Sequence, residues 1–144
     1  MYKQKQTTTD YNTASKLQKK SMVSSLILSL ATFNVLGLKS PEKRYQLAAD
    51  CYNYSIDILA IQETKCVKSE NTIIQYIDDN DVKHNYRLIL FEQKDCWQAG
   101  VGFMISSKLE SCFKSYGQIS DRVAYCMLIL CFRLNLVTIG HVVL

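Results

Sequence analysis

Hydrophobic residues recur with two different periods in the first half of the chain. Residues 26–35 are apolar on both faces of an extended chain, which is typical of a central, buried strand. Ser40 and Pro41 predict a helix start, and apolar residues continue at helical spacing through 41–54, so one stripe of this helix should face a sheet. The stripe consists of Leu47, Ala48, Cys51 and Tyr52. Residues 56–61 form a second apolar run, and the order strand, helix, strand predicts a βαβ unit with parallel strands.

The second half of the chain carries shorter patterns. A short helix is predicted over 69–78, with Ile73, Ile74 and Ile77 facing inward. Four further strands are predicted, at 86–91, 101–105, 123–132 and 136–142. The last two should form an antiparallel pair with Asn135 at the turn. Residues 92–100 are expected to form a connecting loop. At the start of the strand that follows it, Gly100 and Gly102 permit close approach of the backbone.

Two polar residues follow the predicted parallel strands. Asn34 ends the first strand and Glu63 follows the second, and the carboxyl ends of parallel strands meet at one rim of a sheet. A carboxylate and an amide at such a rim suit Mg²⁺, which binds one or two carboxylates together with water and substrate phosphate. The residues alone leave an alternative open, in which Asn34 makes a turn and Glu63 caps the next loop.

Four segments in this order resemble a known superfamily. LATFNVLGL, DILAIQETK, GVGFMIS and ISDRVAYCMLIL are similar to successive motifs of the endonuclease/exonuclease/phosphatase superfamily, and the similarity covers residues 28–140. Within that superfamily, the chain most resembles the endonuclease domain of non-LTR retrotransposons and of craniofacial development protein 2-like proteins. The four segments in this order indicate the superfamily more specifically than any one of them does.

The resemblance implies a fold and an activity. The fold would be an incomplete four-layer α/β sandwich, with mixed sheets packed face to face and helices outside, of which residues 21–144 form the N-terminal part. The family reaction is cleavage of DNA phosphodiesters that depends on Mg²⁺ or Mn²⁺. By motif position, Glu63 matches the metal-binding glutamate and Asn34 matches the asparagine of the same site.

Several family motifs have no match in this sequence. Where the family continues with a Tyr-Ala-Pro type segment, the chain reads His141 to Leu144, and neither a Gly-Asp-Phe-Asn type nor a Ser-Asp-His type motif is present. The resemblance therefore implies a truncated endonuclease domain that binds metal weakly and is inactive alone. The alternative is a non-catalytic binding module that dimerises, or docks a partner, through an uncovered sheet.

Two residues outside this pair could contact DNA. Trp97 lies in the predicted loop, where it could contact DNA or cover a sheet edge. Arg122 could bind a phosphate, or form a structural ion pair with Asp121 or Glu92.

Charge and composition bear on the tail, on secretion and on cysteine-based metal sites. The net charge of +4 resides in residues 1–20, a polar segment predicted to be a disordered basic tail that either holds phosphates loosely or is simply solvated. The uncharged run 21–38 behind it also fits a secretion signal, but its serines and the lack of an Ala-x-Ala pattern favour a buried strand. We therefore expect an intracellular protein, with the nucleus as one compartment, and no membrane segment. The six cysteines lack metal-ligand spacing and are predicted to be core residues and loop thiols.

Overall fold

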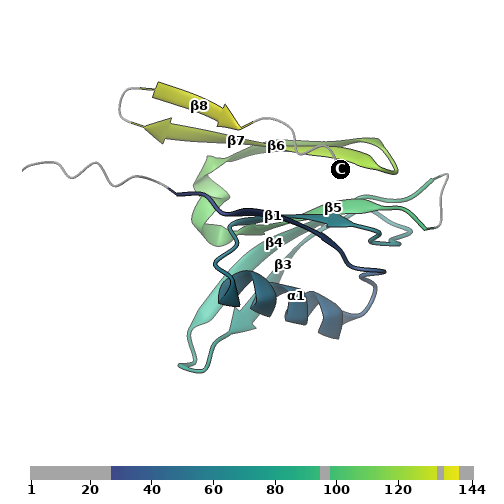
Figure 1. Ribbon diagram of the computed structural model, residues 1–144, viewed down its shortest axis with the longest axis horizontal. Helices are drawn as coiled ribbons and strands as arrows, with labels where there is room; N and C mark the ends of the chain where they lie inside the picture. Colours follow the sequence, from purple (N-terminus) through teal and green to yellow (C-terminus); the bar gives the residue numbers. More distant parts are fainter. Residues whose placement is uncertain (1–26, 95–97, 133–134, 140–144) are drawn as a thin grey trace, which may run out of the picture.

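The described part of the chain forms two β-sheets and one α-helix (Figure 1). The computed structural model describes residues 27–94, 98–132 and 135–139. One sheet has five strands in the order β1-β2-β5-β4-β3, and the other has three in the order β6-β7-β8. The elements are β1 (Leu30–Asn34), α1 (Pro41–Asn53), β2 (Ile58–Gln62), β3 (Glu70–Ile77), β4 (Lys83–Leu90), β5 (Val101–Ser106), the 3₁₀ helix η1 (Ser107–Cys112), β6 (Phe113–Ser120), β7 (Val123–Phe132) and β8 (Asn135–Ile139). The predicted α/β class is confirmed.

Helix α1 begins where the sequence predicted. The Ser40 side chain accepts a hydrogen bond from the Lys43 N–H, and Pro41 occupies the first turn, where its missing N–H has no intrahelical partner. The predicted apolar stripe faces the sheet: Leu47, Ala48 and Cys51 are buried and Tyr52 packs against them. The sequence-based helix is therefore confirmed.

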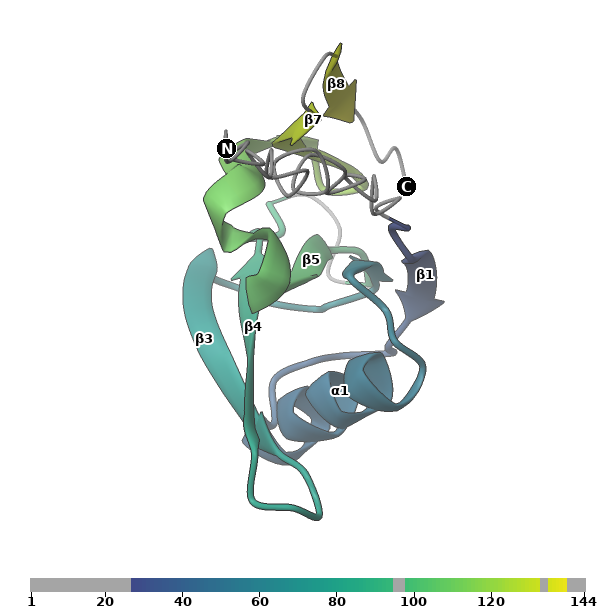
Figure 2. The ribbon, with the colours of Figure 1, turned by 90° about the vertical axis from the view of Figure 1, so that its left-hand side faces the viewer.

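The five-stranded sheet is covered on both faces (Figure 2). In β2, Leu59 and Ile61 belong to the cluster that contains α1, whereas Ile58 and Ala60 point the other way. The second cluster joins this opposite face to buried residues of the three-stranded sheet, which are Ala124, Cys126 and Leu128. Because successive strand residues alternate between faces, the apolar runs of β2 and β5 require cover on both sides.

The βαβ unit is present, but its first strand is not central. Strand β1 pairs in parallel with β2, with Asn34 opposite Gln62, as predicted. However, β1 is an edge strand of the described sheet, and the side chains of Leu30 and Phe33 are 53% and 54% exposed. The prediction of a central, buried strand over 26–35 was therefore wrong, because apolar residues on both faces do not determine how many neighbours a strand has.

Residues 69–78 form a strand, not the predicted helix. Burial along β3 alternates residue by residue, so Ile74 packs into the core while Ile73 and Ile77 are exposed. All three isoleucines could face inward only at helical spacing. The β-branched and aromatic content of this segment favours a strand, and pairing with β4 over eight residues supplies the hydrogen bonds.

The other predicted strands are present, with changes at their ends. Strands β4, β5 and β7 overlap the predicted ranges, and β7 pairs antiparallel with β8. Asn135, predicted at the turn, is the first residue of β8, and β6 was not predicted. The tail 1–20, Trp97, and residues 140–142 of the last predicted strand lie outside the described residues.

Two further expectations concern helices and thiols. Within the described ranges, no helix has both the length and the apolar character needed to cross a bilayer. Four cysteines of these ranges are free: Cys51, Cys66 and Cys126 are buried and Cys112 is half-buried. These four fit the prediction of core residues and loop thiols.

Candidate functional site

The two polar residues predicted at the sheet rim lie in direct contact. Asn34 is the last residue of β1 and Glu63 immediately follows β2, its parallel neighbour. The Asn34 Nδ2 group donates a hydrogen bond of 2.7 Å to Glu63 Oε1. The prediction that both side chains project to a common edge is confirmed, and their role in metal binding stays a prediction.

A backbone contact fixes the orientation of the Asn34 amide. The Leu36 N–H donates a hydrogen bond of 3.1 Å to Asn34 Oδ1, which leaves the NH₂ group to face Glu63. The bond to the carboxylate is charge-assisted and therefore stronger than one between neutral groups. Asn34 thus holds the Glu63 carboxylate in place, and its Oδ1 keeps one lone pair.

The backbone around this pair is strained. Leu36, Glu63 and Lys65 have φ angles of 49°, 52° and 53°, and they are three of the five non-glycine residues with positive φ in the described ranges. Such conformations cost on the order of 1–3 kcal/mol each and tend to cluster at functional sites. Nothing in the sequence pattern signals this strain, because none of the three is glycine or asparagine.

Hydrogen bonds hold the loop after β1 against the loop after β2. The Gly37 N–H donates to Glu63 O at 2.7 Å, and the Leu38 N–H donates to Thr64 O at 2.8 Å. From α1, Lys43 Nζ donates to the carbonyl oxygens of residues 35 and 37. These contacts hold the strained loops in register, so the Asn34–Glu63 geometry is built into the fold.

Gly100 brings the start of β5 against the loop after β2. The Thr64 N–H donates to Gly100 O at 3.1 Å, and the Lys65 N–H donates to Ala99 O at 3.2 Å. Gly100 has a φ of +102°, and a Cβ there would lie 2.4 Å from Thr64 Oγ1. The predicted close backbone approach at this glycine is confirmed.

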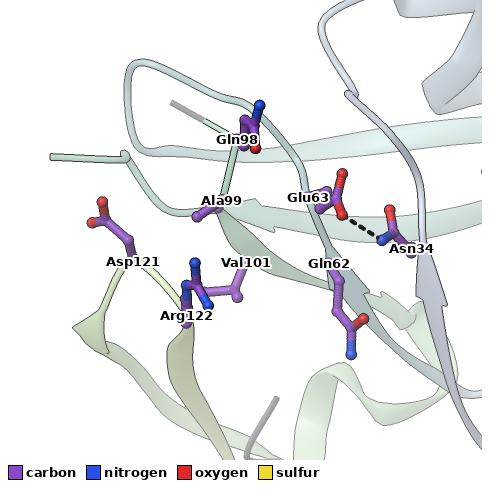
Figure 3. A pocket seen from close by; sticks show the side chains of 9 residues that line it. Asn34, Gln62, Glu63, Gln98, Ala99, Val101, Asp121 and Arg122 are labelled. Atoms are coloured by element: carbon purple, nitrogen blue, oxygen red, sulfur yellow. Dashed lines mark hydrogen bonds between the residues drawn. The ribbon is translucent and has the colours of Figure 1, made fainter. Parts of the chain in front are cut away.

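A pocket of about 370 Å³ opens beside the Asn34–Glu63 pair (Figure 3). Besides this pair, its wall includes Gln62, residues 98–101, and the β6–β7 turn at Asp121 and Arg122. In Figure 3, Arg122 lies across the pocket from Glu63 and Asn34. No sequence pattern places the turn at 121–122 beside the rim of β1 and β2, because the turn follows β2 by nearly sixty positions in the chain.

The predicted ion pair of Arg122 with Asp121 or Glu92 is not found in the described residues. Glu92 instead pairs with Lys94, at 3.3 Å between Oε1 and Nζ. Both carboxylate oxygens of Asp121 accept the Lys94 N–H. The ion pair was one of two alternatives for Arg122, and these described partners do not form it, since the Asp121 carboxylate is turned toward the loop after β4 and Glu92 pairs within that loop. The other alternative, a phosphate contact, stays a prediction.

The oxygen atoms at Glu63 and Asn34 are of the type that binds a hard cation, and a neighbouring lysine competes for the Glu63 carboxylate. Lys65 Nζ lies 3.8 Å from Glu63 Oε2, a loose and partly exposed pair. Oxygen ligands are those that Mg²⁺ prefers, and this ion keeps several waters when a protein offers few ligands. Within the described ranges, no group of three or more His, Cys, Asp or Glu side chains is arranged to hold a metal. Glu63 would therefore be the principal protein ligand, with the free lone pair of Asn34 beside it.

Comparison with known proteins leaves the family open. The chain matches no family model and no curated protein.

Proposed function

We propose that this chain carries the metal-binding half of a Mg²⁺-dependent phosphodiesterase site of the retrotransposon endonuclease type. The observation that supports it is the 2.7 Å hydrogen bond between Asn34 and Glu63, at the carboxyl ends of two parallel strands and beside a pocket. Ligand sites of open α/β sheets lie at such ends. The strained φ angles of Glu63 and Lys65 add support, because strain of this kind is common at functional sites.

Each residue of the pair has a separate task in this proposal. Glu63 would hold the cation through its carboxylate, and Asn34 orients that carboxylate through its amide. A bound divalent ion supplies charge stabilisation for phosphate oxygens and lowers the pKa of bound water. The Leu36 N–H keeps the Asn34 amide from turning, so the carboxylate is held ready before any ion binds.

The same proposal extends to the fold. A four-layer α/β sandwich contains two sheets packed face to face with helices outside. The cluster that joins the five-stranded sheet to Ala124, Cys126 and Leu128 supports the sheet-to-sheet contact, and α1 on the other face supports an outer helical layer.

We predict that the 144-residue chain does not cleave DNA alone. A general acid or base contributes about 10²- to 10⁴-fold, and phosphodiester hydrolysis requires several such contributions together. The pocket contains the Glu63 carboxylate, while the Asp121 carboxylate is occupied by the Lys94 N–H. Purified protein should leave supercoiled plasmid intact in Mg²⁺. Nicking that disappears in Glu63→Ala would contradict the predicted inactivity while supporting the site.

Metal binding is the direct test of the proposed function. Electron paramagnetic resonance counts free Mn²⁺ during a titration, and the protein should bind this ion weakly at one site. Glu63→Gln should abolish that binding, whereas Asp79→Asn, which removes an exposed carboxylate outside the pocket, should leave it unchanged. Equal binding by the wild-type protein and Glu63→Gln would show that the proposal is wrong.

A second candidate function is a non-catalytic interaction module. Strand β1 is an edge strand of the described sheet, and the side chains of Leu30, Phe33 and Leu36 are 53–66% exposed. Exposed apolar strand edges promote association through strand pairing. Sedimentation velocity should then show a dimer that Phe33→Glu dissociates, and a monomer at all concentrations would argue against self-association.

A further inference from the structure

Arg122 differs from the other arginines of the described residues in its partners. The Arg44 guanidinium donates to both carboxylate oxygens of Glu70, at 2.7 and 3.1 Å. The Arg87 guanidinium likewise donates to both oxygens of Glu110. In contrast, the Arg122 side chain is exposed and forms no hydrogen bond or ion pair within the described ranges. Its charge is therefore available to a ligand.

The turn that carries Arg122 is fixed in position. Both carboxylate oxygens of Asp121 accept the Lys94 N–H at 3.0 Å, and Asp121 O accepts the Gly100 N–H at 3.1 Å. Gly100 O in turn accepts the Thr64 N–H, one residue after Glu63. Two backbone hydrogen bonds thus connect the Arg122 turn to the Glu63 loop, so the two side chains are presented to the same pocket by a continuous scaffold.

The Arg122 guanidinium offers an anionic ligand one point of attachment in a pocket wall that also carries the Glu63 and Asp121 carboxylates, and the Asp121 carboxylate accepts the Lys94 N–H. Arg122 is the one positively charged residue among the described residues that line the pocket, and Glu63 lies across from it (Figure 3). A guanidinium can donate two parallel hydrogen bonds to phosphate oxygens. A cation at Glu63 and a guanidinium opposite would together hold a phosphate between them.

From this arrangement we propose that Arg122 contacts a backbone phosphate of a bound DNA strand. The inference rests on the proposed function, because it places the scissile strand in the pocket beside Glu63. Arg122 would bind and orient the phosphate, and this role requires no metal ion.

DNA binding without metal tests the role of Arg122. Anisotropy of a short fluorescein-labelled duplex should be measured for the full chain in EDTA over a range of salt concentrations. Arg122→Gln should weaken binding about tenfold, as expected for loss of a charge-assisted contact, and should reduce the slope of log K against log salt by about 0.9. Arg122→Lys should keep the slope and lose about threefold in affinity, since it retains the charge without the two-pronged geometry.

The matched control is Lys114→Gln, which removes one positive charge from an exposed position near the other end of β6. It should change affinity less than about twofold, because only charges that contact phosphates release counterions. A circular dichroism melt of each variant checks folding, and Arg122→Gln should melt like the wild-type protein because the hydrogen bond of residue 122 to Ser120 uses its backbone N–H.

Equal affinity and equal salt slope for wild-type protein and Arg122→Gln would overturn the inference, as would an equal loss in Lys114→Gln or no DNA binding by the wild-type protein. These failures are separable from failure of the proposed function, which is judged by Mn²⁺ binding and Glu63. A chain that binds DNA through Arg122 but shows no Mn²⁺ binding dependent on Glu63 would retain the phosphate contact and lose the metal site.

Discussion

Gly100 offers a quantitative test of how the site is assembled. Its φ of +102° is a conformation that alanine reaches only with strain, which costs on the order of 1–3 kcal/mol. An added Cβ would also lie 2.4 Å from Thr64 Oγ1 and 3.1 Å from the Lys65 N, and overpacking of this kind costs a further 1–3 kcal/mol or so. Gly100→Ala should therefore lower the free energy of unfolding by about 2–6 kcal/mol. At about 3 °C per kcal/mol for a chain of this size, the Tm should fall by roughly 6–18 °C.

Gly37 separates the conformational cost of a positive φ from the steric cost of an added Cβ. Its φ of +101° is almost the same, but the nearest atom to an added Cβ is Lys65 Cδ at 3.8 Å, an ordinary contact. Gly37→Ala should therefore show the conformational cost alone, about 1–3 kcal/mol. Urea denaturation of both variants measures the difference. Equal destabilisation would refute the steric contact between residues 100 and 64, and a neutral Gly100→Ala would refute the backbone geometry itself.

Three further predictions concern charges and thiols. The hydrogen bonds of Asp78 with His84 and the Val82 N–H hold the pKa of this carboxyl well below its usual range, so its contribution to stability is present above about pH 4 and is lost as the pH falls further. Urea denaturation at several acidic pH values should show a shallower loss of stability for Asp78→Asn than for the wild-type protein, and identical profiles would argue against this role. Lys65→Gln should raise Mn²⁺ affinity about 1.5- to 5-fold, because Lys65 competes with the ion for the Glu63 carboxylate and an exposed ion pair contributes about 0.2–1 kcal/mol. A lower Mn²⁺ affinity in this variant would contradict the pairing of Lys65 with Glu63. Burial raises the pKa of Cys51 to about 12, so iodoacetamide at neutral pH should label half-buried Cys112 before Cys51, as mass spectrometry can show. Earlier labelling of Cys51 than of Cys112 would contradict the burial of Cys51.

The βαβ unit could be predicted because its signals are local. Ser40 and Pro41 define the start of α1 by their own chemistry, and the spacing of Leu47, Ala48 and Cys51 defines the face that packs. The strand after this helix follows from a continuous apolar run, so the placement of Glu63 near Asn34 followed from the parallel pairing.

The secondary-structure predictions were wrong where contacts between distant segments of the chain determine the structure. The edge position of β1 depends on strands that come from elsewhere in the chain, so the apolar run before Asn34 could not reveal it. The segment of β3 contains isoleucines at 73, 74 and 77, whose spacing fits a helical face although their β-branched side chains favour a strand, and pairing with β4 decides for the strand. Strand β6 has few large apolar residues and two register shifts against β7, so it lacks a clear alternation.

The two central residues of the site could be predicted from the sequence, but the residues around them could not. Asn34 and Glu63 stand at strand ends, which the sequence marks. Arg122 joins them through long-range backbone contacts at Gly100, and the positive φ values of Leu36 and Glu63 follow from the loops that meet there. These features depend on packing between distant segments, which no local pattern encodes.

Paramagnetic broadening by Mn²⁺ in amide NMR spectra locates a bound ion and so tests the central claim most directly. Substoichiometric Mn²⁺ should broaden the signals of Asn34, Glu63 and Gly100 first, together with those of the turn at 121–122, and Glu63→Gln should abolish the effect. Broadening that centres on other residues, or that persists in Glu63→Gln, would contradict a metal site built on the Asn34–Glu63 pair.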